Sequence, residues 1–176
     1  MKKWVILAIL LTIALFLAYR GYSYYIHWKY KKDLVAEYMN NLAPDAIGTT
    51  IEGKKWSLKA QKGKDVIIVF WASWCRPCRK EMPNIIALQK RFGDDADAVI
   101  ISSVLDENVS NIRSFVQERG INYPVLLDEE HPGMKSEFNR NFKIVNIPSI
   151  WVVDKKGRVI AQNLLHLDEA MTYIDR

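Results

Sequence analysis

Residues 65–78, DVIIVFWASWCRPC, place an apolar, β-branched run directly before two cysteines three positions apart. A run of this length is typical of a central strand that is covered on both faces. The segment 76–92 that follows has the apolar spacing of a helix, in which Pro83 should introduce a kink. Cys75 would lie at the helix start, where free backbone N–H groups and the helix dipole favour a thiolate. Cys78 would lie one turn further in, placed to attack a mixed disulfide formed by Cys75.

The two cysteines are the only ones in the chain, so they compete with no third thiol. Inert core residues, a structural disulfide and half of a zinc site are the other interpretations. A tetrahedral zinc needs about four ligands, and His27, His131 and His166 are isolated in the sequence. A bridge that closes so short a loop constrains the unfolded chain very little. We therefore expect a redox-active disulfide, Cys75–Cys78, with no metal and no organic cofactor.

The N-terminal segment has the composition of a membrane anchor. Residues 4–19 carry no charge, but this uncharged segment is short for a membrane span, which usually needs about 20 residues. Extending the helix to residue 26 adds only Arg20, whose long side chain can reach the headgroups. We expect an uncleaved anchor over residues 1–26, with residues 4–26 in the lipid bilayer. A cleaved secretory signal is the alternative, because it shares the basic start and the short apolar run.

The positive charge of the chain is concentrated near this segment. Residues 1–32 hold six of the 25 Lys and Arg and none of the 20 Asp and Glu, which leaves 19 basic against 20 acidic residues in 33–176. Such a basic excess suits lipid headgroups, and no nucleic-acid partner is expected. The basic residues on the two sides of the apolar run nearly balance, so charge alone does not orient the anchor.

The pattern of the remaining chain predicts a helical stalk followed by one domain. Residues 27–42 mix charged and apolar positions like a helix that continues from the membrane, and residues 43–176 suffice for a single core. Strands are expected at 65–72, 98–104, 125–127, 149–154 and 158–164, and helices at 76–92, 109–119, 133–141 and 167–174. This alternation, ending in a hairpin over 154–157, predicts an α/β fold with a central sheet of mixed direction.

Four sequence segments occur in a distinctive order along the chain. They are APD at 43–45, FWASWCRPCRKEMP at 70–83, YPVLLD at 123–128 and IPS at 147–149, followed by Asp154 and Gly157. Together they resemble the membrane-anchored thioredoxin-like proteins of bacteria called TlpA-like or ResA-like, over residues 43–176. The resemblance implies a thioredoxin-like fold, a central mixed sheet flanked by helices, with the family's strand–helix insertion around 98–119 after an N-terminal transmembrane helix.

The resemblance also implies roles for individual residues. Cys75 would be the nucleophile and Cys78 the resolving cysteine of a thiol-disulfide oxidoreductase. Pro148 would be a cis proline beside the cysteines, where backbone groups bind an extended substrate chain; an ordinary trans proline is the alternative. The expected catalytic residues are Cys75, Cys78 and Glu81, and the expected substrate-binding residues are Trp74, Arg76, Pro77, Ile147 and Pro148.

Glu81 follows Cys78 by three positions and so lies on the same face of the predicted helix. The family places a partly buried acid here, which could give a proton to Cys78 and accept one from it. The alternative is a solvated surface glutamate. Arg76 lies between the cysteines, where its charge would favour the Cys75 thiolate and a more oxidising couple. A surface arginine without an electrostatic role is the alternative for Arg76.

Three positions depart from the pattern of general thioredoxins. Val69 stands where they carry a buried aspartate, Asn146 where a glycine is usual two residues before the cis proline, and Ser149 where a threonine commonly follows it. These changes leave the expected fold intact. They bear on the groove that binds the partner protein, and the first of them moves any acid–base role to Glu81 or to water.

We expect a membrane-tethered oxidoreductase in the bacterial cytoplasmic membrane, with its catalytic domain on the periplasmic side. It would exchange disulfides with extracytoplasmic proteins as a reductant, for example in cytochrome c maturation. Its second partner would be a membrane electron donor or acceptor of the disulfide relay. A non-catalytic thioredoxin-like binding module is one alternative, although it would not need Cys78. A peroxiredoxin-type peroxidase is another, although Ala72 stands where such enzymes usually carry threonine or serine.

Overall fold

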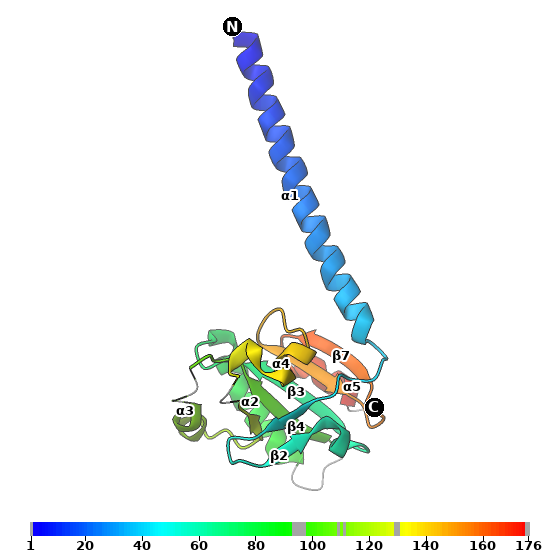
Figure 1. The fold of residues 1–176 in the computed structure, drawn as a ribbon, viewed down its shortest axis with the longest axis vertical. Coiled ribbons are helices and arrows are strands. Elements are labelled where there is room, and N and C mark those ends of the chain that lie inside the picture. The colour runs from blue at the N-terminus through cyan, green and yellow to red at the C-terminus, as the bar shows by residue number, and fades with distance from the viewer. Residues whose placement is uncertain (1, 93–97, 109, 111, 129–130, 175–176) are drawn as a thin grey trace. The chain divides into compact units, whose positions relative to one another are not determined.

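The computed structural model describes residues 2–92, 98–108, 110, 112–128 and 131–174 (Figure 1). The chain divides into two units, Met1–Tyr38 and Met39–Arg176. The first unit is a single helix, α1 (Lys2–Tyr38). Its segment Lys3–Lys29 is long and apolar enough to be a candidate membrane span.

The second unit begins at Met39, four residues before the domain start expected at Ala43. Asn40 has a φ of 63°, a left-handed conformation that asparagine tolerates, and it directs the chain out of the helix. The Asn40 N–H then donates to the Val159 carbonyl at 2.8 Å, and the Ala43 N–H to the Gly157 carbonyl at 2.8 Å. The expected stalk over 27–42 is therefore helical only to Tyr38, and its last residues pair with the final hairpin.

A five-stranded sheet forms the centre of the second unit. In spatial order its strands are β5 (Val125–Leu126), β4 (Ala98–Val104), β3 (Asp65–Trp71), β6 (Ser149–Val153) and β7 (Val159–Leu164). The central strand β3 is parallel to β4 and antiparallel to β6; β4 is parallel to β5, and β6 is antiparallel to β7. The predicted sheet of mixed direction is thus confirmed.

Both faces of β3 are covered, which explains its unbroken apolar sequence. Ile67, Val69 and Trp71 belong to a core shared with three helices, α2 (Arg76–Phe92), α3 (Ile112–Arg119) and α5 (Leu167–Ile174). On the other face Phe70 lies 5.8 Å, between ring centroids, from Phe138 of α4 (Glu137–Asn141). The helix α2 continues through Pro83 without interruption.

The segment before β3 contains structure that the sequence pattern did not predict. It forms a hairpin, β1 (Ile47–Thr49) with β2 (Lys55–Ser57), and a 3₁₀ turn, η1 (Leu58–Gln61). The hairpin lies beside the edge strand β5, because the Leu127 N–H donates to the Thr49 carbonyl at 3.0 Å. Strands of three residues are too short to show a period in sequence.

The helix expected over 133–141 is instead two shorter pieces. A 3₁₀ turn, η2 (Gly133–Lys135), precedes α4, and Ser136 separates them. The Ser136 side chain accepts a hydrogen bond from the Asn139 N–H at 3.2 Å and so caps α4. The helix expected over 109–119 begins at Ile112, and residues 109 and 111 lie outside the described part of the chain.

Candidate redox site

The two cysteines form a disulfide where strand β3 passes into helix α2. Cys75 and Cys78 are joined by an S–S bond of 2.06 Å, with their Cα atoms 5.3 Å apart. Both are buried, with 4% of Cys75 and 2% of Cys78 exposed. The sequence placed the Cys75 sulfur outward, but little of Cys75 is accessible to solvent in the disulfide form. The neighbouring Trp74 is the exposed residue at this site, with 66% of its surface accessible.

Cys75 occupies the position just before the first turn of α2, as the sequence predicted. Its carbonyl accepts a hydrogen bond from the Arg79 N–H at 3.1 Å. Its sulfur accepts one from the Cys78 N–H at 3.2 Å. A backbone donor at a helix N-terminus stabilises negative charge on sulfur. Of the two sulfurs, the geometry thus favours Cys75 as the thiolate.

A buried carboxylate fixes the loop that leads into Cys75. The Ser73 backbone N–H donates to Asp106 at 2.8 Å, and the Ser73 hydroxyl donates to the other oxygen of the same carboxylate. Asp106 is 5% exposed and lies just beyond β4. Sequence reasoning missed Asp106. The signal was available, because parallel neighbours β3 and β4 end at the same edge of the sheet.

The peptide bond between Ile147 and Pro148 is cis, as expected from the family resemblance. Pro148 and Cys78 line one narrow crevice, so the proline lies beside the redox pair. The following residue, Ser149, accepts a hydrogen bond from the Trp151 indole at 3.1 Å and donates one to the Asn163 side chain at 3.1 Å. Asn146 is not among the described residues with positive φ, so its replacement of glycine requires no strained backbone there.

Two open clefts lie on either side of Ile147. The Arg76 cleft, of about 630 Å³, is lined by Arg76, Pro77, Lys80, Glu81, Asn146, Ile147, Pro148, Leu165 and His166. The Trp74 cleft, of about 680 Å³, is lined by Trp74, Leu105, Asp106, Glu107, Asn108, Met134, Ile144, Val145, Asn146 and Ile147. Each residue of the expected substrate-binding set therefore lines at least one of the two clefts.

The Glu81 carboxylate is largely buried and is held from the far side by the segment after β7. Its side chain is 14% exposed, and its Oε1 lies 3.0 Å from Nδ1 of His166. The Leu167 N–H donates to Glu81 Oε2 at 3.5 Å. Glu81 also lines the same crevice as Cys78. Glu81 is therefore largely buried and not a solvated surface glutamate. His166, which no local sequence signal connects to the cysteines, was missed.

Glu81 raises the pKa of His166 above its ordinary value of 6.5, mainly through their hydrogen bond, while Asp168 and Glu169 add attraction. A raised folded pKa means that the pair stabilises the fold fully below the unfolded pKa of His166 and loses this effect as pH rises through the folded pKa. We expect His166→Gln to lower the free energy of unfolding at about pH 6 and to have no such effect at about pH 9. Urea unfolding at both values measures this, and a penalty equal at both would contradict it.

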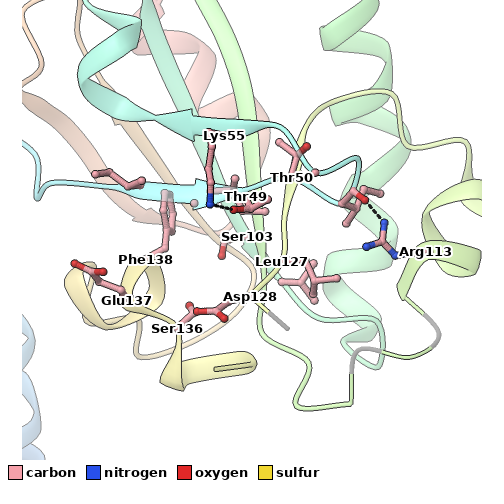
Figure 2. Close-up of a pocket in the computed structure, with 16 residues that line it drawn as sticks. Thr49, Thr50, Lys55, Ser103, Arg113, Leu127, Asp128, Ser136, Glu137 and Phe138 are labelled. Carbon is pink, nitrogen blue, oxygen red and sulfur yellow. Dashed lines mark hydrogen bonds between the residues drawn. The ribbon is translucent and has the colours of Figure 1, made fainter. Parts of the chain in front are cut away.

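A third cleft, of about 560 Å³, lies over the β1–β2 hairpin (Figure 2). Its two cations are engaged by their own surroundings: Lys55 donates to the Thr49 hydroxyl at 3.0 Å, and Arg113 donates to the Ile51 carbonyl. The residues that line it include neither cysteine and none of the expected site residues. We assign it no part in disulfide chemistry.

Comparison with known proteins supports the same chemistry. A sequence model of the AhpC/TSA family matches residues 39–162. The thioredoxin-like protein YneN of Bacillus subtilis (strain 168) is 34% identical over 158 residues, covering 89% of this chain and 86% of that protein. The thiol-disulfide oxidoreductase ResA of Bacillus cereus (strain ATCC 10987 / NRS 248) is 32% identical over 158 residues, covering 90% and 83%.

Solved structures give the same result for the fold. A thiol:disulfide interchange protein of the thioredoxin family from Chlorobium tepidum TLS matches with a TM-score of 0.61 and 30% identity, over 70% of this chain and 84% of that chain. StoA from Bacillus subtilis matches with a TM-score of 0.63 over 77% of this chain and 100% of that chain; at 23% identity, it supports the fold alone. The thioredoxin-like fold expected from the sequence is confirmed.

Proposed function

The chain belongs to the AhpC/TSA family and is a thioredoxin-like thiol-disulfide oxidoreductase related to ResA and YneN, and from this premise we propose that it reduces disulfides of extracytoplasmic proteins. The observation that carries the assignment of roles is the hydrogen bond from the Cys78 N–H to the Cys75 sulfur. It supports Cys75 as the thiolate that attacks first. Cys78 then resolves the mixed disulfide.

The proposed cycle balances in two exchanges. The Cys75 thiolate attacks one sulfur of the substrate disulfide, which forms a mixed disulfide and releases the first substrate thiolate. Cys78 gives up its proton and attacks the Cys75 sulfur, which forms the Cys75–Cys78 disulfide and releases the second substrate thiolate. Two electrons pass to the substrate. A dithiol partner of the membrane relay then reduces the Cys75–Cys78 pair by the same chemistry in reverse.

Glu81 is the proposed acceptor of the Cys78 proton. It shares a crevice with Cys78, and its carboxylate is oriented by His166 and the Leu167 N–H. A carboxylate that is fixed in place and largely buried is suited to local proton transfer. His166 is a positioning residue here, because it acts through Glu81.

The proposed substrate-binding surface combines the Arg76 cleft and the Trp74 cleft. Exposed apolar side chains frame it, including Trp74, Val145 and Leu165, at 66%, 52% and 44% exposure. Such a cluster beside a buried disulfide suits an extended, partly apolar polypeptide that brings its own cysteine to Cys75. Trp74, Arg76, Pro77, Ile147 and Pro148 are the residues that we assign to this contact.

We further propose that α1 anchors the protein in the bacterial cytoplasmic membrane, with residues 43–176 on the periplasmic side. The apolar segment Lys3–Lys29 supports the anchor. The direction of electron flow, towards reduced cysteines such as those needed in cytochrome c maturation, follows the family resemblance. The charge of Arg76 favours the opposite direction, because stabilising the Cys75 thiolate makes the couple more oxidising.

Trapping of substrates tests this function. The full-length Cys78→Ala variant should accumulate mixed disulfides through Cys75 when it is expressed in a bacterial membrane, because no second thiol resolves them. The matched control is the double variant Cys75→Ala, Cys78→Ala, which should trap nothing. Identification of the trapped proteins by mass spectrometry gives the substrates. If the single variant also traps nothing in its own compartment, the protein does not exchange disulfides there, and a binding module becomes the better assignment.

A further inference from the structure

One buried hydroxyl group in the described part of the chain is not explained by the fold. Tyr123 is 3% exposed, and its hydroxyl has no hydrogen-bond partner. A buried polar group without a partner destabilises the state in which it is found. Phenylalanine would fill the same space without the cost of an unpaired hydroxyl group. The presence of the hydroxyl group would be explained by another state of the protein in which it has a hydrogen-bond partner.

Tyr123 lines the same narrow crevice as Cys78 and Glu81. This crevice is lined by Val69, Trp71, Cys78, Glu81, Met82, Ile85, Tyr123, Pro148 and Ile150, and it is too narrow to hold a water molecule. The indole N–H of Trp71 is likewise buried without a partner on the same crevice. Val69 contributes no polar group to it.

The two sulfurs have unequal surroundings. Cys75 receives a backbone N–H, whereas in the described part of the chain no hydrogen bond reaches the sulfur of Cys78. A disulfide sulfur is a weak acceptor and tolerates this. Reduction turns Cys78 into a thiol that must ionise before it can attack, and an ionised group in an apolar site needs a donor. Burial raises the pKa of Tyr123 well above its ordinary value, so its hydroxyl keeps its proton and remains a donor.

We propose that Tyr123 donates a hydrogen bond to Cys78 in the reduced protein and thereby stabilises the thiolate that resolves the mixed disulfide. The proposal rests on the proposed function. In the resolving step the Cys78 proton leaves to Glu81 or to solvent, and Tyr123 retains its own proton. The new bond forms between the sulfurs of Cys78 and Cys75, while the bond between Cys75 and the substrate sulfur breaks and the substrate thiolate leaves. In the oxidised protein the Tyr123 hydroxyl has no hydrogen-bond partner among the described residues, and the disulfide-bonded sulfur of Cys78 is a weaker acceptor than a thiolate.

The test uses Tyr123→Phe, which removes only the hydroxyl group, in the full-length protein in detergent micelles. The chain has two cysteines, so ¹³Cβ-labelled cysteine gives two resonances whose pH titrations can be followed separately. We expect the pKa of Cys78 to rise in the variant and that of Cys75 to stay in place. Glu81, His166 and Arg76 also titrate or carry charge around the site, so the measurement is the difference between variant and wild type.

The rate of the resolving step gives a second measurement. Suppose that Tyr123→Phe lowers the population of the Cys78 thiolate roughly tenfold. The thiolate of higher pKa is also the stronger nucleophile and attacks about threefold faster, so the resolving step becomes about threefold slower at pH values below the pKa of Cys78. Stopped-flow release of the second substrate thiol from a disulfide-linked fluorescent peptide measures this. Formation of the mixed disulfide by Cys75 should keep its wild-type rate, so a failure of the proposed function would appear as loss of that first step in the wild type itself.

The stabilities of the oxidised and reduced forms separate the proposal from a merely structural role of Tyr123. Because the hydroxyl has no partner among the described residues of the oxidised protein, the proposal predicts that Tyr123→Phe leaves the urea midpoint of the oxidised form unchanged or higher and lowers the midpoint of the reduced form. A merely structural role predicts a lower midpoint of the oxidised form as well. Tyr173→Phe is the matched control, because Tyr173 is a partly buried tyrosine that does not line the crevice, and it should leave the Cys78 titration unchanged. An unmoved Cys78 titration in Tyr123→Phe, or a lower midpoint of its oxidised form, would overturn the proposal.

Discussion

Replacement of Cys75 by serine is expected to lower the rate of disulfide exchange by about three orders of magnitude or more, to the uncatalysed background. Serine fits the space of cysteine, so the fold should persist. A hydroxyl at this position ionises far too weakly to act as the nucleophile, even with the Cys78 N–H directed at it. The remaining thiol of Cys78 lies within the first turn of α2, one turn beyond the Cys75 position, so we expect it to be a poor substitute as the attacking group.

The matched control for this prediction is Cys78→Ser. That variant retains the attacking sulfur, so it should release one equivalent of substrate thiol and then stop as a mixed disulfide. Single-turnover release of thiol from a disulfide-linked peptide measures both variants. If Cys75→Ser kept turning over while Cys78→Ser lost even the first equivalent, the two cysteines would have to exchange their assigned roles.

Sequence reasoning recovered the elements that carry strong periodic signals. The unbroken run 65–72 and the helix 76–92 correspond to β3 and α2 within one residue, because burial on both faces and an amphipathic helix leave clear patterns. It failed at the β1–β2 hairpin and at the break at Ser136. The hairpin depends on a contact with the distant Leu127 and leaves no period in the sequence. The break at Ser136 does have a local signal, a serine that caps the helix through the Asn139 N–H three residues later, but apolar periodicity does not register it.

The site was predictable where its residues are neighbours along the chain. Cys75, Cys78 and Glu81 share one helix, so their spacing alone places them together. His166 and Tyr123 come from the segments after β7 and before β5, and only the sheet topology brings them to Glu81 and to the crevice. Motif spacing therefore does not show which distant residues meet the redox pair, even where, as with Tyr123, the residue stands in a segment that carries the family resemblance.

Glu81→Gln is expected to slow the resolving step by about a hundredfold near neutral pH, the low end of what a positioned general base contributes. Glutamine keeps the size of glutamate and can still accept a hydrogen bond from the Leu167 N–H, but it cannot take up the Cys78 proton. The same change removes the main cause of the raised pKa of His166, which should return towards 6.5. The two effects are measured independently, by stopped-flow thiol release and by NMR titration of the imidazole.

Loss of a general base differs from loss of packing in its pH dependence. As pH rises, Cys78 ionises without help and the need for Glu81 disappears, so the rate of Glu81→Gln should approach that of wild type in alkaline solution. Glu118→Gln on the exposed face of α3 is the matched control for the change of charge, and it should leave both rate and profile unaltered. A deficit in Glu81→Gln that stays constant with pH would mean that Glu81 shapes the site without moving a proton, and the proton from Cys78 would then have to leave directly to solvent.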